Sequence, residues 1–404
     1  MKNFSDINLA QRCKDGVLGL QHLVAMFGAT TLVPLLTGLD VSVALFSAGI
    51  GTLIFHFVTK KQVPVFLGSS FAFIPVIAAV MHNTGSRGHV QGGLIAAGLL
   101  YLLFSFLVMK VGIEKINYMI PPYIVGTMIA IIGLSLIPVA INMASYYIPL
   151  AVITLVTALI IHFFSCGFTK QLSIIIAVGV GYISSLIVNA VDTSIITSSA
   201  WISVPAFTKP VFDLNSIFII APVVLATFME HIGDITASGT VANKNFLKEP
   251  GLHKTLIGDG LATVFAGLVG GPANTTYSEN TGVLAITKNY DPKVLRIAAV
   301  FAILLAFISK IGAVLSSIHV AVLGGISLLL FFMIAHIGIK TLIEDKFWIS
   351  PEKIFVIAAM TIIAFSSFSL NITSDVSLSG MGLAAIVGII LNTIAYKKIK
   401  RHDG

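Results

Sequence analysis

The sequence predicts an all-α polytopic membrane protein. Apolar residues make up 56% of the chain and charged residues only 10%, with a mean hydropathy of +0.99. Soluble domains carry about a quarter charged residues. The apolar residues fill long blocks instead of alternating positions, which excludes a membrane β-barrel. The net charge of +7 therefore indicates the basic cytoplasmic loops of a membrane protein, and we expect no nucleic-acid partner.

Fourteen apolar blocks can be assigned to membrane spans, each of which needs roughly 20 residues of helix, or fewer where the span is broken. Eleven blocks are clear: 16–36, 41–59, 91–111, 119–141, 147–165, 171–190, 214–233, 294–316, 318–340, 352–369 and 381–396. Three are weaker: 63–82, 254–270 and 271–287. Gly, Pro, Ser and Asn interrupt the first and last of these three.

The distribution of Lys and Arg supports this number of spans. With a cytoplasmic N-terminus, only Arg87, Lys209 and Lys310 of the 24 basic residues fall outside. Removing one span would reverse the side of every later loop. We therefore expect a multi-pass protein of the inner (cytoplasmic) membrane with both termini in the cytoplasm. The polar segment Met1–Asp15 precedes a block long enough to span, so no cleavable signal peptide is expected.

An internal repeat relates the two halves of the chain. A shift of 209 residues places "LQHLVAMFGATT" (20–31) on "MEHIGDITASGT" (229–240) and "GSSF" (68–71) on "YSEN" (277–280). Both matches fall at equivalent spans, the first and third of two sets of seven. Because seven is odd, the second set must insert upside down, as in secondary transporters with inverted repeats. We expect the repeats to be residues 1–205 and 206–404, with the site where the third and tenth spans are broken.

Three carboxyl groups lie at apparent membrane depth, where a charge costs about 3 kcal/mol: Glu230, Asp234 and Glu279, with Asp259 as a further candidate. Glu230 and Asp234 are four residues apart, so both lie on one helix face and could share an exchangeable proton. Such an arrangement suits proton coupling. The alternative for Asp234 is a helix end at the cytoplasmic surface.

The neighbouring ionisable residues have less specific interpretations. His22 is either a functional group facing the broken region or a hydrogen-bonded packing residue, and the residues alone leave both open. We interpret His231 as structural, because it lies off the Glu230–Asp234 face. Asp259 in "IGDGLAT" is interpreted as organising a helix start. His56 and His319 are taken as structural.

The residue types around the broken spans favour a small, polar, uncharged solute. The first, third, eighth and tenth spans contain no Lys or Arg, so an anion would lack a counter-charge. Carboxylates accept hydrogen bonds, while backbone N–H groups near Phe71 and Ser278 can donate to carbonyl oxygens. A nucleobase would satisfy both, and Phe71 and Tyr277 could add stacking or wall contacts. No metal-ligand spacing or activated nucleophile is present, so we expect no enzyme activity, metal or cofactor.

The stretch "SENTGVLAITK" (278–288) resembles the signature of the nucleobase–ascorbate transporter (nucleobase:cation symporter 2) family. The signature is an acidic residue or Gln, Asn, any residue, Gly, four residues, Thr and a basic residue. Its positions are matched here by Glu279, Asn280, Gly282, Thr287 and Lys288. "LQHLVAMFGAT" and "FLGSSFAF" are also similar to bacterial uracil permeases, and the similarity runs through nearly the whole chain.

The resemblance implies a core domain of spans 1–4 and 8–11 and a gate domain of spans 5–7 and 12–14. It implies short antiparallel strands in spans 3 and 10, a homodimer, and proton-driven uptake by elevator-like movement. Uracil would be held by Glu230 and Glu279, with backbone contacts from Phe71 and Ser278, while Ala29 would line the pocket.

The resemblance also assigns roles in orientation and proton coupling. His22 would hydrogen-bond Glu279, and we group His22 and Asn280 with Glu230 and Asp234 as residues of coupling or orientation. An acidic first signature position is typical of pyrimidine carriers.

Three positions depart from uracil carriers. Asp234 stands where a histidine is expected, Phe331 replaces a tyrosine at the pocket, and Ser278 replaces a glycine. The alternatives are therefore a carrier for xanthine or another base, an anion exchanger or channel on the same plan, and, least favoured, a membrane-embedded enzyme.

Overall fold

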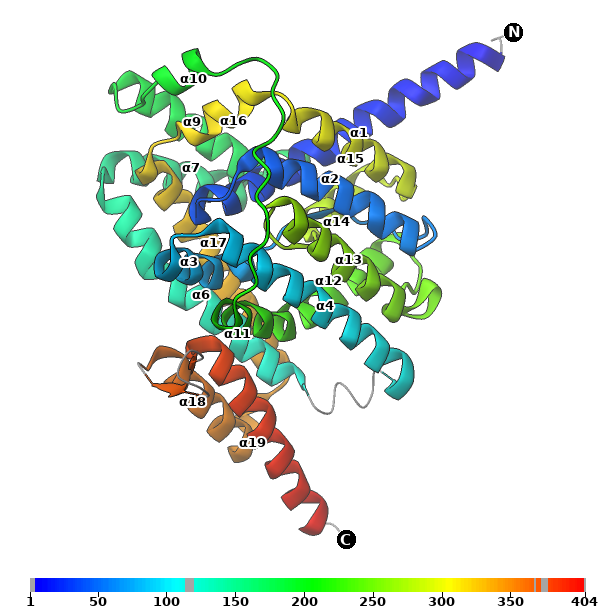
Figure 1. Ribbon diagram of the computed structural model, residues 1–404. Coiled ribbons are helices and arrows are strands. Elements are labelled where there is room, and N and C mark those ends of the chain that lie inside the picture. The colour runs from blue at the N-terminus through cyan, green and yellow to red at the C-terminus, as the bar shows by residue number, and fades with distance from the viewer. Residues whose placement is uncertain (1–3, 113–119, 367, 372–376, 403–404) are drawn as a thin grey trace.

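The computed structural model describes residues 4–112, 120–366, 368–371 and 377–402, and it is dominated by helices (Figure 1). Every one of the expected apolar blocks coincides with one or more of the observed elements. The helices of the first half are α1 (Phe4–Thr37), α2 (Val41–Val58), α3 (Ile74–Thr84), α4 (Arg87–Val111), α6 (Pro122–Ser145), α7 (Ile148–Phe164), α8 (Gly167–Gln171), α9 (Ser173–Ile187) and α10 (Ser194–Ser198). Those of the second half are α11 (Leu214–Ile220), α12 (Val224–Ala242), α13 (Leu252–Val269), α14 (Ser278–Thr287), α15 (Pro292–Ala306), α16 (Ser309–Ser316), α17 (Val320–Glu344), α18 (Pro351–Phe365) and α19 (Gly380–His402).

In the described part of the chain, six helices are long and apolar enough to cross a membrane. The number is seven when the bent pair Pro292–Ala306 and Ser309–Ser316 is counted as one span. Shorter apolar helices occupy several of the remaining blocks: Phe71–Thr84, Ile148–Phe164, Ser173–Ile187 and Gly380–Ile394. The protein is thus a multi-pass membrane protein, and the number of fourteen crossings stays a prediction.

Local signals in the sequence explain where several helices begin. Asp40 accepts a hydrogen bond from the Val43 N–H (2.9 Å) at the start of α2, and Asp291 does the same for Lys293 (2.8 Å) at α15. Asp213 caps α11, where the hydroxyl and backbone N–H of Ser216 donate to its carboxylate and lower its pKa. Loop carboxylates therefore satisfy N–H groups that a helix start leaves without partners.

The block 294–316 is not the single helix that its apolarity predicts. α15 ends at Ala306, and α16 leaves at an angle of 79°. The extended segment 199–213 is bonded at this break: Ser203 N–H donates to Phe307 O (3.1 Å), and Ser309 N–H donates to Trp201 O (3.2 Å). Contacts from a segment remote in the sequence are invisible to a hydropathy profile.

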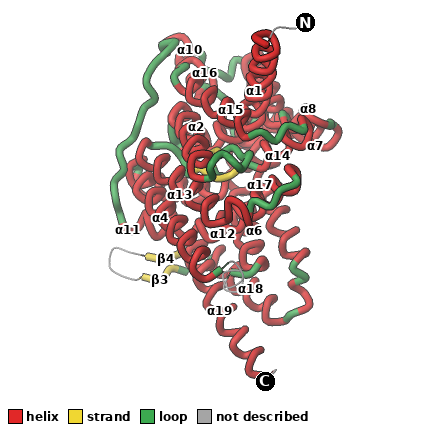
Figure 2. The backbone as a smooth tube through the Cα atoms, turned by 90° about the vertical axis from the view of Figure 1, so that its right-hand side faces the viewer, coloured by secondary structure: helices red, strands yellow, loops and turns green. Residues whose placement is uncertain are grey.

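Two short strands lie side by side near the middle of the molecule, as expected for spans 3 and 10 (Figure 2). β1 (Leu67–Ser69) pairs antiparallel with β2 (Asn274–Thr276), with Gly68 opposite Thr275. All six residues are buried. A second pair, β3 (Ser369–Asn371) with β4 (Ser377–Ser379), lies at the edge of the molecule and was not expected.

The helices pack into two groups around these strands. α2, α4, α13 and α15 pack against one another, and α1 joins them through α15. In the second group α17 packs along α6 and α7, and α18 packs on α19 and α6. The α6–α17 crossing depends on glycine: a Cβ at Gly133 would lie 2.4 Å from the Ala335 nitrogen, and one at Gly338 would lie 2.3 Å from the Ala130 nitrogen. The assignment of these groups to mobile domains stays a prediction.

Gly68→Ala is expected to destabilise the central strand pair. A Cβ at Gly68 would lie 2.5 Å from ring atoms of Tyr277 and 2.6 Å from the Thr30 hydroxyl oxygen. Such overpacking costs about 1–3 kcal/mol, so the Tm of the purified protein in detergent should fall. Gly179→Ala in α9 is the control, because a Cβ there meets nothing within 4 Å. An unchanged Tm for Gly68→Ala would contradict the strand packing described here.

Candidate functional site

A cavity of about 380 Å³ lies between α12 on one side and α6 and α17 on the other. This volume falls in the range of about 300–1,000 Å³ that is typical of small-molecule pockets. We call it the acidic cavity, because Glu230 and Asp234 are the charged residues among the described ones that line it. The remaining lining residues are Phe71, Ala72, Pro122, Val125, Ile129, Ile132, Ala226, Met229, Ile232, Gly233, Ile334, Ile337 and Thr341.

The helical period of α12 explains why both carboxyl groups reach the cavity. Glu230 and Asp234 are four residues apart and therefore lie on the same face. Phe228, His231 and Ile235 are buried on other faces of α12. The pairing of Glu230 with Asp234 expected from the sequence is thus present in the cavity wall.

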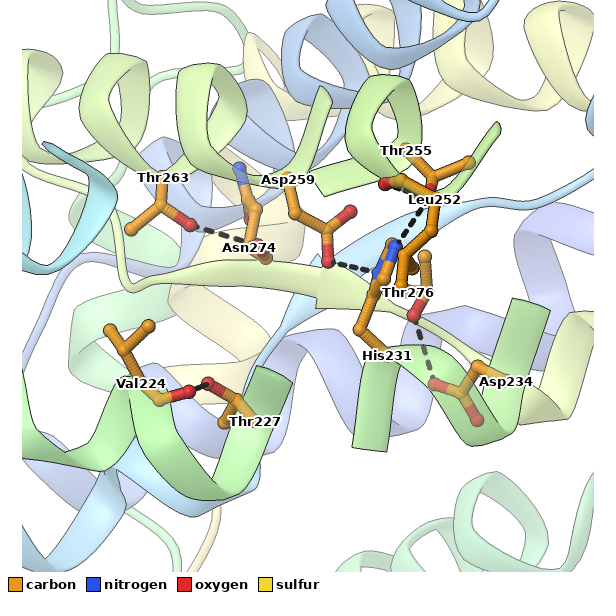
Figure 3. Close-up of polar contacts among 10 residues, drawn as sticks. All are labelled: Val224, Thr227, His231, Asp234, Leu252, Thr255, Asp259, Thr263, Asn274 and Thr276. Carbon is orange, nitrogen blue, oxygen red and sulfur yellow. Dashed lines mark hydrogen bonds and ion pairs between the residues drawn. The ribbon is translucent and has the colours of Figure 1, made fainter. Parts of the chain in front are cut away.

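Asp234 is held by the central strands. The hydroxyl of Thr276 in β2 donates a hydrogen bond of 3.0 Å to the Asp234 carboxylate (Figure 3). α12 continues beyond Asp234 to Ala242, so the alternative that this residue marks a helix end is wrong. The link connects a cavity carboxyl group directly to the broken tenth block.

His231 lies on a neighbouring face of α12 and does not line the acidic cavity. Its Nδ1 lies 2.8 Å from Asp259 Oδ2 and its Nε2 lies 2.8 Å from the Thr255 hydroxyl oxygen (Figure 3). The structural interpretation of His231 is therefore confirmed. That of Asp259 is wrong: it is the eighth residue of α13 and is completely buried, far from the helix start. The only sequence signal was an acidic residue within an apolar block.

A helical element begins directly after each of the two central strands. The 3-10 turn η1 (Phe71–Phe73) follows β1 and leads into α3, while α14 begins at Ser278 after β2. The first N–H groups of a helix have no partner within it and favour an anion or carbonyl oxygen. Phe71 also lines the acidic cavity, as expected for a pocket residue.

Glu279 lies in the first turn of α14 and is half-buried. It interacts electrostatically with both Glu230 and Asp234, so the fold brings the three sequence-selected carboxyl groups together. Glu279 itself is not among the described residues that line the acidic cavity. Glu230 and Asp234 therefore line the acidic cavity, and Glu279 lies beside them.

His22 meets Asn280 and not the neighbouring Glu279 to which the resemblance assigned it. The Asn280 amide nitrogen lies 3.1 Å from His22 Nδ1 and 3.0 Å from the His22 carbonyl oxygen. An amide NH₂ group has two hydrogens and can donate both bonds, which makes Nδ1 an acceptor. The signature asparagine thus ties α14 to α1.

Three other expected pocket residues are packed inside the described part of the protein and do not line the acidic cavity. Tyr277 is 4% exposed and donates its hydroxyl to Ser69 O at 2.7 Å, so it braces the strand pair. Ala29 in α1 and Phe331 in α17 are each 1% exposed. Their roles as substrate contacts stay predictions.

Comparison with known proteins identifies the family. Residues 14–373 match the model of the Permease family, Xan_ur_permease. The chain belongs to this family. It is 38% identical over 391 residues to the uracil permease of Escherichia coli, covering 93% of this chain and 90% of that protein. It is 39% identical over 394 residues to the uracil permease of Bacillus caldolyticus, covering 93% and 91%. These relatives are named permeases, so the family member described here is a transporter and not an enzyme.

Solved structures of two other transporters share the fold of this permease. The transmembrane domain of a cyanobacterial bicarbonate transporter, BicA, aligns with a TM-score of 0.65 at 17% identity, covering 94% of this chain and 96% of that one. The murine Solute Carrier 26 family member A9 anion transporter aligns with a TM-score of 0.66 at 12% identity, covering 95% and 68%. At these identities the likeness concerns the fold alone.

Asn280→Asp is expected to destabilise the permease. An ionised aspartate has no hydrogen to donate and would place its oxygen against the His22 carbonyl oxygen, at a cost of about 1–3 kcal/mol. Asn289→Asp is the matched control, because the Asn289 side-chain oxygen only accepts a bond from the Asp291 N–H. A clear fall in Tm is expected for the first variant alone. Equal Tm values for both variants would contradict the bonding described for Asn280.

Proposed function

We propose that this permease imports uracil together with a proton across the cytoplasmic membrane by an elevator-like alternating-access mechanism. One observation carries the proposal: Glu230 and Asp234 line a mainly apolar cavity beside a broken strand-to-helix element, in a chain related over most of its length to uracil permeases. The site therefore combines acceptors that can exchange protons with walls that suit a planar base.

The chemistry of uracil fits this cavity region. Its ring alternates N–H groups with C=O groups. Glu230 and Glu279 would accept hydrogen bonds from the ring N–H groups, while backbone N–H groups at Phe71 and Ser278 would donate to its carbonyls. Phe71 would contact the ring face. Ala29, Tyr277 and Phe331 would act behind these groups, since all three are buried in packing contacts.

The coupled proton would reside on the carboxyl groups of α12. Asp234 occupies the place of the histidine of uracil carriers, so we assign proton coupling to a carboxyl pair, Glu230 with Asp234. His22 and Asn280 would orient α14 and with it Glu279, since Asn280 donates to both the ring and the carbonyl of His22. No cofactor is needed for this cycle.

The proposed transporter has fourteen spans in two inverted repeats, residues 1–205 and 206–404, with both termini in the cytoplasm. Spans 1–4 and 8–11 would form the moving core, and spans 5–7 and 12–14 a gate that also mediates homodimer formation. In support, α12 and Phe71 form one wall of the acidic cavity, while α6 and α17 form the other. Movement of one wall past the other would expose the cavity in turn to each side.

Two alternatives remain of interest. A purine such as xanthine is the first, because Asp234 and Phe331 depart from the uracil pattern. An anion is the second, because the fold is shared with BicA and with the murine anion transporter. Against an anion, the described residues that line the acidic cavity include two acids and no Lys or Arg.

Uptake of labelled uracil into proteoliposomes tests the proposal. We expect an inward proton gradient to stimulate uptake and a protonophore to abolish the stimulation, because a co-transported proton contributes its gradient to the driving force. Protein-free liposomes are the control, and excess xanthine or bicarbonate tests the alternatives. Uptake that is indifferent to the proton gradient would rule out symport.

Glu279→Gln is expected to weaken uracil binding by about tenfold or more, because hydrogen bonds to charged groups contribute about 1.5–3 kcal/mol. Isothermal titration calorimetry of the purified variant measures the change. Glu344→Gln is the matched control, since Glu344 is exposed and only faces Lys340 at 3.7 Å. Unchanged affinity in Glu279→Gln would place the binding site elsewhere.

A further inference from the structure

The buried pair His231–Asp259 is absent from the proposed transport steps, yet it is the most completely enclosed ion pair in the described part of the chain. Both side chains are 0% exposed, and Nδ1 lies 2.8 Å from Oδ2. The second carboxylate oxygen, Oδ1, has no hydrogen-bond partner among the described residues. Burial of an unneutralised carboxylate in such a place would be very costly.

The hydrogen bonds around the His231 ring indicate how many protons the pair holds. Thr255 has a single hydroxyl hydrogen, which can be donated either to Leu252 O at 2.9 Å or to a bare His231 Nε2 at 2.8 Å. When the hydroxyl donates to Leu252 O, the 2.8 Å contact between His231 Nε2 and the Thr255 oxygen is a hydrogen bond only if Nε2 carries a hydrogen. The Nδ1–Oδ2 contact requires another hydrogen between those two atoms. In that arrangement the ring and the carboxyl group hold two protons between them, and the pair has no net charge, which avoids the cost of a buried, unneutralised carboxylate.

We propose that His231 and Asp259 form a charge-neutral pair that retains its proton and acts as a positioning device for Glu230. The pair fastens α12 to α13. Successive residues of a helix point about 100° apart, so fixing His231 toward α13 directs the adjacent Glu230 toward α6 and α17. This rotation of α12 places Glu230 in the wall of the acidic cavity.

Among the described residues, acids and a phenol interact electrostatically with Asp259. Glu230, Asp234 and Glu279 interact electrostatically with one another, and Asp259 interacts with Glu230, with Asp234 and with Tyr101 of α4. A negatively charged pair would repel the cavity carboxylates. A neutral pair leaves them free to respond to the substrate and to the coupled proton.

The first experiment locates the ring protons directly. Solid-state NMR of the full-length protein with ¹⁵N-labelled histidine, compared with the His231→Gln variant, assigns the two ring nitrogens of His231. We expect a hydrogen on Nε2 at neutral pH. A ring with a bare Nε2 would leave the pair negative and would overturn the proposal, whether or not the protein transports uracil.

The second experiment tests charge neutrality with a second substitution that removes the unpaired charge left by the first. His231→Gln alone leaves Asp259 as an unpaired buried carboxylate, so Tm should fall and uracil affinity should drop at least about tenfold. Adding Asp259→Asn removes that charge. We expect affinity to return to within about threefold of the wild type, because the two introduced amide side chains can hydrogen-bond each other in place of the ion pair. A double variant no better than the single one would overturn the proposal.

The pH dependence separates positioning from simple packing. In His231→Gln, protonation of Asp259 relieves the unpaired charge, so Tm and affinity should recover as the pH falls. The double variant lacks this recovery. Glu230, Asp234, Glu279 and Tyr101 are present in both variants, so a recovery seen only in the single variant is attributed to the Asp259 carboxyl group.

The affinity measurements rest on the proposed function, whereas the NMR and Tm measurements do not. Failure of the wild type to bind uracil would refute the proposed function alone. Loss of the expected Tm difference between the single and double variants would refute the neutral pair alone.

Discussion

The antiparallel pairing of β1 with β2 is the interaction on which the rest of this permease depends. Extended backbone within an apolar interior must find all its hydrogen bonds inside the protein. Here the two strands satisfy each other, and side chains satisfy their edges: Leu67 N–H donates to the Thr52 hydroxyl at 2.9 Å, and the Thr263 hydroxyl donates to Asn274 O at 2.9 Å. The pairing also sets where η1 and α14 begin, and so where their free N–H groups point.

The central strands also contact one of the acidic groups. Thr276 of β2 contacts Asp234, while Tyr277 braces Ser69 on the partner strand. Asp259 instead forms a buried ion pair with His231, where α12 faces α13. The carboxyl groups thus have distinct environments: Asp259 is completely buried, whereas Glu230 and Asp234 line the acidic cavity.

The close approach of α6 to α17 supplies the opposing wall. Glycines at the crossing let the two backbones approach closely, and α12 packs against α6 across from them. The proposed alternating-access mechanism would use these two separately packed walls of the acidic cavity.

Much of this was determined by the sequence itself, because hydropathy and helical period act locally. Apolar blocks marked the helices, the spacing of Glu230 and Asp234 placed both on one face, and the glycine- and asparagine-rich stretches marked the broken elements. Only the tertiary structure decided the partners: Asn280 for His22, Asp259 for His231, and segment 199–213 for the bend at Ala306. These contacts join residues from distant parts of the chain, and no local pattern records which distant donor will satisfy a buried acceptor.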